Sequence, residues 1–405
     1  MTSTPDTNID FDHTDPEFFQ SPYQTFQDLH RTCPVARSSK FGGFWVLSKY
    51  DDVVEAARDT TTFSSAEGIS IPKVGSLIPL VPIEADPPLH TEFRRTLQHE
   101  FSRGRMARLE PSIRTLTNEL IDGFIDRGHA DLAVELATPL PSIVLAELLG
   151  LERSEWATFR TQVADLVATS RIGDTEANTK TSIEFAMHFM QALDDRRQNP
   201  RDDMLTRIVQ STVGDRPVKP EEALGLTLVT VIAGHETTVG GIGSMLMHVG
   251  TNPQLKARLL ADASLIPRAV EETVRMEAPI QGAARTVTRP TCIRGRSFDP
   301  GDRVWLLYAA GNRDADTFAE PDGFDLDRRP NRHLGFGEGV HRCVGAPLAR
   351  IEMRIVLEEV LRRMPGLRIP DPSAVRFEGA QSRTIGALPA EWDQPIRPGP
   401  AGPPR

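Results

Sequence analysis

One short stretch limits most strongly what this chain of 405 residues can fold into: a glycine-rich loop that contains a single cysteine. The stretch runs from His333 to Arg350, and Cys343 follows glycines at positions 335, 337 and 339. A lone cysteine is most often an inert, buried side chain. Here glycines let the backbone turn tightly around the sulfur, and residues 345–364 have apolar side chains at helical spacing. The pattern predicts that Cys343 precedes a helix N-terminus, where backbone N–H groups and the helix dipole favour a thiolate.

A single thiolate without a partner cysteine suits one axial position on haem iron. From Phe336 to Gly345 the chain reads Phe-Gly-x-Gly-x-His-x-Cys-x-Gly. This pattern resembles the haem-binding signature of the cytochromes P450 at every fixed position. The resemblance implies that Cys343 is the iron ligand and that Phe336 and Gly337 contact the haem.

The composition narrows the remaining function classes. Hydrophobic residues make up 39% and charged residues 25% of the chain, which is typical of a globular protein. A net charge of -10 argues against nucleic acid as a partner. No apolar run approaches the roughly 20 residues that span a membrane, and three scattered cysteines fit a reducing compartment. We therefore expect a cytoplasmic protein that binds neither nucleic acid nor membranes.

Three segments are expected along the chain. Residues 1–20 show little periodicity and predict an extended or mobile N-terminal arm. Residues 398–405 are rich in proline and glycine and predict a disordered tail. Residues 21–397 contain no repeat or linker, so we expect one domain. The resemblance implies a mainly α fold, a helix-rich triangular prism with small β-sheets, in which haem lies between a long distal helix and the loop and helix around the cysteine.

The long helix is predicted over residues 221–249. It contains five glycines, each of which costs about 1 kcal/mol relative to alanine in a helix. Close approach to a flat ligand would be one compensating gain. Glu236 interrupts an apolar run within this helix, and pairing with a distant cation is the structural alternative. A zinc motif of the H-E-x-x-H type fails because position 239 is valine.

The middle of this helix reads Ala233-Gly234-His-Glu236-Thr237. It resembles the acid–alcohol motif of the family, A-G-x-[DE]-T. The resemblance implies that Glu236 and Thr237 relay protons to dioxygen, for which the small residues Ala233 and Gly234 leave room. A threonine hydroxyl that bonds back to the carbonyl four residues earlier would also loosen the helix locally.

His90 and Arg94 are one turn apart on a predicted helix. Such a pair ordinarily belongs to a solvated face. The resemblance to the H-x-x-x-R motif of the family implies instead that both residues bind haem propionates through charge-assisted hydrogen bonds. Arg285 and His341 are implied in the same task.

Glu272 and Arg275 form an E-x-x-R pair. Alone, such a pair is common on helix surfaces and means little. Together with Arg328 it resembles a buried salt-bridge triad of the family, whose role is to hold the core that supports the cysteine loop.

The sequence specifies the substrate pocket less closely than the rest of the expected site. Residues 65–82 form an irregular, apolar loop that either packs on the core or lines a pocket, and the resemblance implies a pocket roof. The lid is expected over residues 156–194. The expected lining residues are Ile78, Leu80, Val81, Ala168, Ile232, Ile280, Gln281 and Ile385, with Lys73, Arg171, Gln281 and Arg383 as polar contacts. We expect a medium-sized, largely hydrophobic substrate.

These features predict a haem b monooxygenase of bacterial type that uses dioxygen and two electrons to hydroxylate an organic molecule in secondary metabolism or catabolism. The same chemistry could end in oxidative coupling, desaturation or ring formation. A haem sensor or carrier without turnover is the alternative of another class, and the intact Glu236 and Thr237 argue against it.

No flavin or iron–sulfur segment is apparent in the sequence, so we expect electrons to come from separate proteins. The resemblance implies a ferredoxin or flavodoxin and its reductase, and we expect a monomer. Five arginines flank motifs on the cysteine side and either dock an acidic partner or are simply solvated: Arg103, Arg105, Arg108, Arg332 and Arg342.

Overall fold

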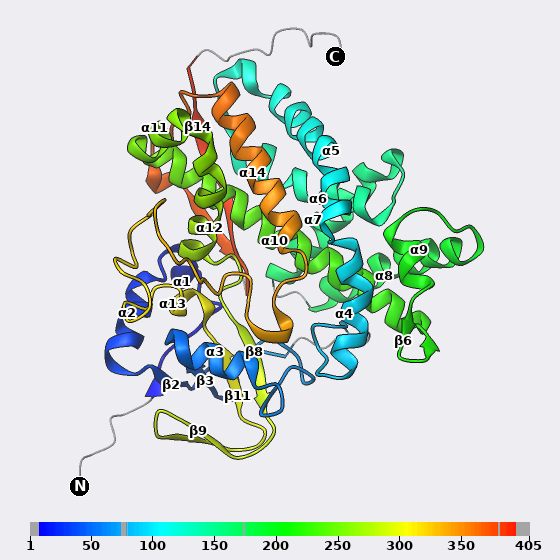
Figure 1. The fold of residues 1–405 in the computed structure, drawn as a ribbon, viewed down its shortest axis with the longest axis vertical. Coiled ribbons are helices and arrows are strands. Elements are labelled where there is room, and N and C mark those ends of the chain that lie inside the picture. Colours follow the sequence, from blue (N-terminus) through cyan, green and yellow to red (C-terminus); the bar gives the residue numbers. More distant parts are fainter. Residues whose placement is uncertain (1–7, 74–77, 79, 173–174, 380, 394–405) are drawn as a thin grey trace.

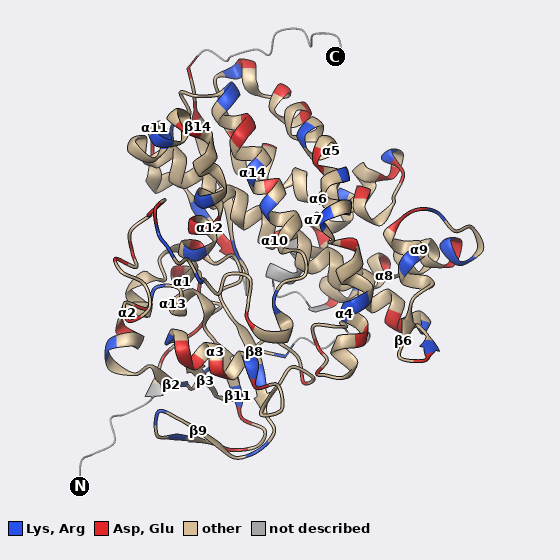
Figure 2. Cartoon of the chain, viewed as in Figure 1, with Lys and Arg blue, Asp and Glu red and all other residues tan. Residues whose placement is uncertain are grey.

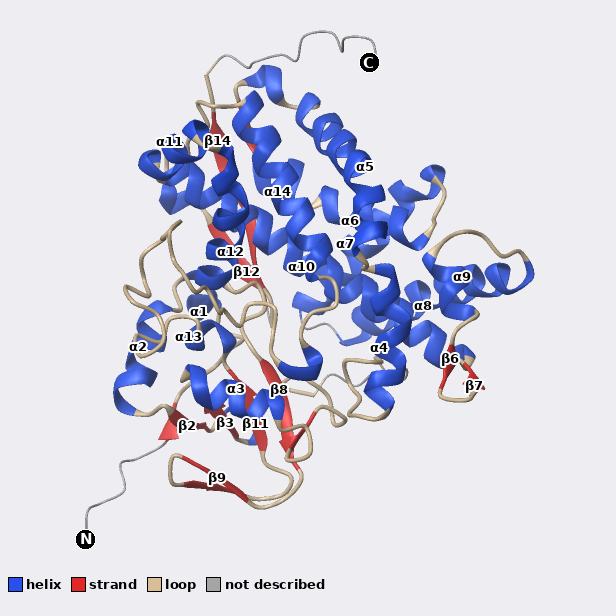
Figure 3. Ribbon diagram, in the orientation of Figure 1, coloured by secondary structure: helices blue, strands red, loops and turns tan. Residues whose placement is uncertain are grey.

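The computed structural model describes residues 8–73, 78, 80–172, 175–379 and 381–393. Helices dominate it, and the strands form small sheets (Figures 1 and 3). This agrees with the predicted helix-rich fold. The predicted tail, residues 398–405, lies outside the described residues, and a single domain over residues 21–397 stays a prediction.

The helices have the following bounds: α1 (Pro16–Gln20), α2 (Tyr23–Thr32), α3 (Tyr50–Arg58), α4 (Leu89–Glu100), α5 (Arg103–Asp122), α6 (Pro139–Leu149), α7 (Trp156–Ile172), α8 (Thr175–Gln198), α9 (Met204–Val209), α10 (Pro220–Thr251), α11 (Pro253–Ala261), α12 (Ile266–Glu277), α13 (Tyr308–Gly311) and α14 (Ala346–Arg363). Within the described ranges, none of these helices is both long and apolar enough to span a membrane.

The largest sheet has six strands in the order β1-β2-β3-β11-β8-β4, and four two-stranded pairs lie outside it. The strands of the large sheet are β1 (Asn8–Ile9), β2 (Val35–Ser38), β3 (Phe44–Leu47), β11 (Arg303–Leu306), β8 (Ala283–Val287) and β4 (Phe63–Ser64). The pairs are β9 (Thr291–Ile293) with β10 (Arg296–Phe298), β12 (Arg376–Gly379) with β13 (Arg383–Ala387), β5 (His129–Asp131) with β14 (Pro389–Glu391), and β6 (Thr212–Val213) with β7 (Arg216–Pro217).

Helix α10 runs through the centre of the molecule and confirms the prediction of one long helix (Figure 1). Pro220 occupies its first turn, and the Glu222 side chain accepts from the backbone N–H of Lys219. The helix ends at Asn252, whose side chain caps α11. Helices α6, α8, α12 and α14 and strand β13 all pack against α10, so it positions much of the core.

Two of the glycines of α10, Gly240 and Gly243, serve a different purpose from the one expected, whereas Gly234 and Gly241 line a cavity. A Cβ at position 240 would lie 2.6 Å from the carbonyl oxygen of Arg383, and a Cβ at position 243 would lie 3.1 Å from the Cβ of Ile385. Both contacts are with strand β13. The interpretation that these two glycines admit a flat ligand is therefore wrong, because they let the β12–β13 hairpin lie directly on the helix.

The N-terminal segment also differs from the expected mobile arm. Strand β1 pairs in parallel with β2. Phe11, Phe18 and Phe19 are buried, and His13 lies 4.3 Å from Trp305 between ring centroids. Aromatic burial of this kind ties residues 8–20 to the core. No periodic pattern indicated this anchoring, because the anchoring residues are spaced irregularly along the chain.

Helix α14 contains a buried carboxyl group that the sequence did not single out. Glu352 is 1% exposed, and its Oε2 atom has no hydrogen-bond partner among the described residues. Burial raises the pKa of Glu352 to about 8. The folded protein therefore keeps this carboxyl protonated at neutral pH.

We predict that Glu352→Gln stabilises the protein at neutral pH. In the native chain the unfolded state ionises Glu352 from its ordinary pKa of 4.5, whereas the folded state stays protonated up to about pH 8. Stability therefore falls as the pH rises through this window, by about 3 kcal/mol at pH 7 for a shift of this size. Thermal unfolding should show a higher Tm for the variant at pH 8 and equal Tm values near pH 4.5.

The control is Glu358→Gln on the same helix, where the carboxylate is paired with Arg114 and Arg354. This variant should gain no stability at pH 8. A Tm of Glu352→Gln that equals the native Tm at every pH would contradict the prediction.

Candidate functional site

The cysteine loop spans residues 333–345 and leads directly into α14. Gly337 (φ 68°) and Gly339 (φ 70°) adopt the left-handed conformation that favours glycine, which turns the chain twice before the cysteine. The Cys343 N–H donates to the Phe336 carbonyl oxygen at 2.7 Å. The backbone N–H groups of Gly345 and Ala346 donate toward the Cys343 sulfur. The loop therefore holds Cys343 beside the N-terminus of α14, where the sequence predicted it.

The side chain of Cys343 faces a cavity. Its solvent-exposed surface belongs to the cavity wall, and protein surrounds it on the other sides. Burial raises the pKa of the Cys343 thiol, and the N–H groups of Gly345 and Ala346 and the charges of Arg94 and Arg350 act in the opposite direction. The expected effect of the N–H groups is present, but burial outweighs it. A bound cation would make the thiolate the stable form.

The cavity has a volume of about 250 Å³ and lies between the cysteine loop and α10. Residues of α4, α10 and β8 complete its walls. The predicted site residues that line it are His90, Arg94, Ala233, Gly234, Thr237, Ile280, Arg285, Phe336, Gly337, His341 and Cys343. Segments separated by more than 200 residues of sequence thus meet at one place.

The α10 wall faces the cysteine loop. The Thr237 hydroxyl donates to the Ala233 carbonyl oxygen at 2.9 Å, and the Thr238 hydroxyl donates to that of Gly234 at 3.0 Å. Both threonines line the cavity. Glu236 does not belong to the lining, and its Oε2 atom accepts a hydrogen bond from the Ser382 hydroxyl at 3.1 Å. The predicted back-bonds are present, and α10 continues through them as a regular helix.

Positively charged and imidazole side chains gather at one rim of the cavity. The rings of His90 and His341 lie 4.4 Å apart between centroids. Burial, together with the charges of Arg94 and Arg285, lowers the pKa of His90 to about 4. The same causes, with His90 added, lower the pKa of His341 to about 2. Each group destabilises the charged form of its neighbours.

This rim has buried polar groups that can bind an anion. Arg285 is 2% exposed, and its Nε atom and the Nδ1 atom of His90 are buried without a hydrogen-bond partner. No carboxylate pairs with Arg94 or Arg285 in the part of the chain that the structure describes. Buried polar groups ordinarily find partners, so a ligand with carboxylates would satisfy these groups.

The other predicted pocket residues mostly lie elsewhere. Of that set only Ile280 lines the cavity. Val81, Gln281 and Ile385 are buried in the core, Ile232 is 46% exposed, Ala168 is exposed, and Ile78 and Leu80 pack on the core. The reason is side-chain alternation and loop packing, which the sequence did not reveal. None of the described residues of α7 or α8, the predicted lid, lines this cavity.

The expected polar contacts are likewise occupied within the protein. Lys73 pairs with Glu67 at 2.9 Å, and Arg383 is buried in an ion pair with Glu277. The Gln281 amide donates to two backbone carbonyl oxygens. None of these three side chains lines the cavity, and the side chain of Arg171 lies outside the described residues.

Several lining residues were missed. Residues of the expected roof loop that reach the cavity are Ile69 and Pro82. The further lining residues include Phe101, Leu145, Val229, Thr230, Thr238, Tyr308 and Gln381. Leu145 and Thr238 stand in or beside segments that the sequence marked as helical, but their orientation depends on how α6 and α10 cross.

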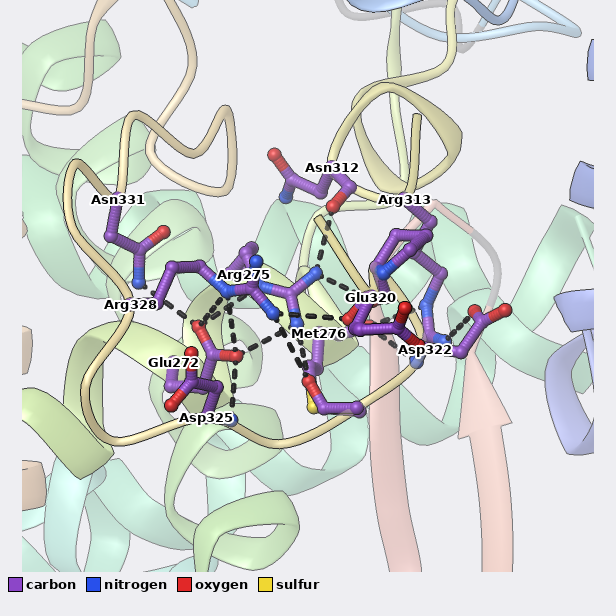
Figure 4. Close-up of polar contacts among 12 residues, drawn as sticks. Glu272, Arg275, Met276, Asn312, Arg313, Glu320, Asp322, Asp325, Arg328 and Asn331 are labelled. Atoms are coloured by element: carbon purple, nitrogen blue, oxygen red, sulfur yellow. Dashed lines mark hydrogen bonds and ion pairs between the residues drawn. The ribbon is translucent and has the colours of Figure 1, made fainter. Parts of the chain in front are cut away.

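Glu272 lies at the centre of a buried ion-pair network below the cysteine loop (Figure 4). Its carboxylate accepts from Arg275 at 2.8 Å and from Arg328 at 3.0 Å. The Asn331 amide also donates to it, at 3.1 Å. Arg275 donates onward to the carbonyl oxygens of residues 312, 321 and 323. The network joins α12 to the segment that leads into the loop.

The chain matches known proteins over most of its length. A family model described as cytochrome P450 matches residues 157–365. Cytochrome P450 107B1 of Saccharopolyspora erythraea is 32% identical, over 95% of this chain and 97% of its own. The mycinamicin IV hydroxylase/epoxidase of Micromonospora griseorubida is 33% identical, over 91% and 94%. The structure of cytochrome P450 CYP109Q5 from Chondromyces apiculatus superposes with a TM-score of 0.86 at 32% identity, covering 95% of this chain and 98% of that one.

The chain belongs to the cytochrome P450 family and is a monooxygenase, an oxidoreductase. Its family implies a haem cofactor. The cavity fits such a group: a cysteine sulfur on one wall, the small residues Ala233 and Gly234 on the opposite wall, and unpartnered N–H groups at the rim.

We predict that Arg94→Gln weakens haem retention by roughly tenfold, because a charge-assisted hydrogen bond contributes about 1.5–3 kcal/mol. The haem-to-protein ratio should be measured after dialysis against a haem-binding competitor. Arg95→Gln is the matched control, since Arg95 is next in sequence but exposed and paired with Glu92. Equal haem retention in the two variants would show that Arg94 does not contribute to haem binding.

Proposed function

We propose that this protein uses haem b to insert one atom of dioxygen into a medium-sized, largely hydrophobic organic molecule, most simply by hydroxylation. The observation that supports this most directly is the position of Cys343 across one cavity from Thr237, with a cationic rim beside both. When bound, haem supplies the electron-accepting and oxygen-activating chemistry, and thiolate ligation favours O–O cleavage.

In this proposal each cavity wall has its own task. Cys343 would ligate the haem iron through its sulfur, with Phe336 and Gly337 beside it on the same wall. His90, Arg94, Arg285 and His341 bind the propionates, which satisfies the buried nitrogen atoms of His90 and Arg285. Burial first, and the neighbouring charges of Arg94 and Arg285 second, lower the pKa values of the two histidines, and the propionates would give their ring nitrogen atoms hydrogen-bond partners.

Proton delivery is proposed for the α10 wall. The Thr237 hydroxyl lines the cavity, whereas the Glu236 carboxylate lies behind it on Ser382. Glu236 is half-buried and can exchange protons with solvent, and the Thr237 hydroxyl can pass a proton into the cavity once it rotates away from the Ala233 carbonyl oxygen. A sensor or carrier would need no such pair.

The ligand assignment predicts that Cys343→Ser abolishes the red-shifted absorbance band of the reduced, CO-bound haem thiolate. The measurement is the difference spectrum of the reduced protein with and without CO. Cys292→Ser, a change at an exposed cysteine outside the cavity, is the control and should keep the band. A persisting band in the Cys343 variant would refute the ligand assignment and with it the proposed function.

The relay predicts that Thr237→Ala keeps haem bound but releases much of the electron flow as hydrogen peroxide, with product per electron pair reduced several-fold. The comparison is Thr238→Ala, because Thr238 lines the same cavity and makes the same back-bond one position later. Product and peroxide should be measured together against electrons consumed. An equal yield of product per electron pair in the two variants would show that Thr237 has no special role in proton delivery.

The proposed substrate class follows from the lining. Two of its polar side chains away from the rim are engaged within the protein: the Thr230 hydroxyl donates to the Leu226 carbonyl oxygen, and the Gln381 amide is bonded to Ser70, Ile69 and Gly282. Apart from Tyr308 and the threonines of α10, the remaining walls are apolar, so hydrophobic contact dominates recognition. A relative named as a hydroxylase/epoxidase makes epoxidation the second outcome to test.

The proposed electron source is a separate ferredoxin or flavodoxin with its reductase, acting on a cytoplasmic monomer. Arg103, Arg108, Arg332 and Arg342 are exposed, whereas Arg105 is held by Glu100 at 3.0 Å. Positive and negative residues are interspersed along α5 and α14, so neither helix presents a purely positive surface (Figure 2). Because Arg105 is paired, we assign a docking role only to the four exposed arginines.

The experiment that tests the substrate class is a titration of the purified haem protein with a graded series of hydrophobic metabolites. Binding near the iron is read from the shift of the haem from low to high spin. Ligands that shift it are then incubated with dioxygen and surrogate electron donors, and mass spectrometry distinguishes a gain of oxygen from desaturation or coupling.

A further inference from the structure

A second ion-pair cluster holds the cysteine loop, independently of the Glu272 network. It consists of Glu271 on α12, His333 and Phe336 in the loop, and Arg350 on α14, and we name it the Glu271 clamp. It connects the two helices on either side of the loop to the loop itself. The sequence analysis assigned no role to Glu271 or Arg350.

The contacts within the clamp are directional. Arg350 donates from Nε to Glu271 Oε1 at 2.6 Å and from Nη2 to Oε2 at 2.9 Å, a two-pronged pairing that only arginine can make. The Gly335 N–H donates to Nδ1 of His333 at 3.2 Å, so the ring proton is on Nε2. From there His333 donates to Glu271 Oε2 at 3.2 Å. One carboxylate therefore binds both the loop and α14.

The guanidinium of Arg350 also reaches toward the cysteine. It lies over the Phe336 ring, 4.3 Å from the centroid, which is a cation–π contact. The carbonyl oxygen of Phe336 accepts the hydrogen bond from the Cys343 N–H at 2.7 Å. Two contacts thus connect Arg350 to the backbone of Cys343.

The loop has little freedom to take another path. A Cβ at position 335 would lie 2.5 Å from the Val274 carbonyl oxygen, so the chain crosses α12 in direct backbone contact. The residues on either side of this crossing, His333 and Phe336, are the ones that the clamp holds. The clamp fixes the loop at the crossing.

Stability alone is a weak reason for this arrangement. The Arg350 and Glu271 side chains are 33% and 31% exposed, and ion pairs with that much solvent access contribute about 1 kcal/mol or less. The geometry points to a positioning role: we propose that Arg350, oriented by Glu271, holds Phe336 and thereby sets the placement and the electrostatic surroundings of the Cys343 sulfur. This proposal rests on the proposed function, in which Cys343 is the haem ligand.

The test uses the haem-loaded protein and three variants, Arg350→Gln, Glu271→Gln and Arg350→Lys. Two quantities are measured: the fraction of reduced, CO-bound haem that keeps thiolate ligation, and the haem reduction potential. Arg354→Gln is the matched control, because Arg354 is one turn further along α14 and pairs with Glu110 and Glu358 instead.

Loss of thiolate ligation should increase several-fold in all three clamp variants and stay at the native level in Arg354→Gln. The potentials should move in opposite directions. Arg350→Gln leaves an uncompensated negative charge near the sulfur and should lower the potential, whereas Glu271→Gln leaves a positive charge and should raise it. Arg350→Lys keeps the charge but loses the fork and the ring contact, so its potential should stay close to native. The double variant Glu271→Gln with Arg350→Gln restores neutrality and should return the potential toward the native value.

Reduction potentials that shift in the same direction in Arg350→Gln and Glu271→Gln would overturn the electrostatic part of the proposal. Loosening of the loop does not depend on the charge removed, so it would shift both potentials in the same direction. Native ligation and potential in all clamp variants, with the band still lost in Cys343→Ser, would overturn the clamp but leave the proposed function intact. If Arg350→Gln or Glu271→Gln fails to load haem, Arg350→Lys alone decides the test. Thiolate ligation at the native level in Arg350→Lys would then overturn the proposal. Survival of the band in Cys343→Ser would instead mean that the proposed function has failed.

Discussion

One buried carboxylate supports a long segment that has almost no regular secondary structure. Residues 312–345 lie between α13 and α14. Glu272 accepts hydrogen bonds from Arg275 on its own helix and from an arginine, an asparagine and a backbone N–H along this segment. Its arginine partners in turn donate to backbone carbonyl oxygens that no helix or strand satisfies, such as those of Ala319 and Pro321. A buried charge is costly unless it is fully paired, and here it is. The network replaces secondary structure as the means of fixing the path to Cys343.

The opposite wall depends on backbone proximity instead of charge. The β12–β13 hairpin approaches α10 over Gly240 and Gly243, and this contact places Ser382 within hydrogen-bond distance of Glu236. The same turn pairs with the Pro279–Gly282 segment through the hydrogen bond from the Arg383 N–H to the Pro279 carbonyl oxygen at 2.7 Å. Glycines at these two positions therefore let the β12–β13 hairpin lie directly on α10, beside Glu236 and the cavity wall. Alanines at positions 240 and 243 would push the hairpin away from the helix.

The sequence was most informative where spacing along one element determines geometry. Cys343 precedes a helix, His90 and Arg94 are one turn apart, and Glu236 and Thr237 are adjacent on α10, so each local arrangement follows from the chain itself. The cavity lining could not be predicted in this way. Ile280 faces the cavity while its neighbour Gln281 points into the core, and only the crossing of distant segments decides between them.

The N-terminal residues and the glycines of α10 show the same limit. Phe11 and Phe18 are buried because they meet residues about 300 positions later in sequence, such as Trp305 and Leu307, in one cluster. Gly240 is explained by the Arg383 carbonyl oxygen, which lies 143 positions further along the chain. Composition and periodicity contain no record of such partners, whereas resemblance to a family gave the order of the motifs and hence the fold.

The cationic rim has a consequence for how the mature protein arises. At one edge of the cavity the structure holds two arginines without a carboxylate partner among the described residues, Arg94 and Arg285, beside the buried imidazoles of His90 and His341. Burying polar groups without partners costs free energy on folding, and a ligand with carboxylates would offset that cost. In the proposed function that ligand is the haem, and a ligand that binds only the folded chain adds to its stability in proportion to the logarithm of its free concentration. The proposed propionate edge would thereby also make the yield of native protein respond to haem supply.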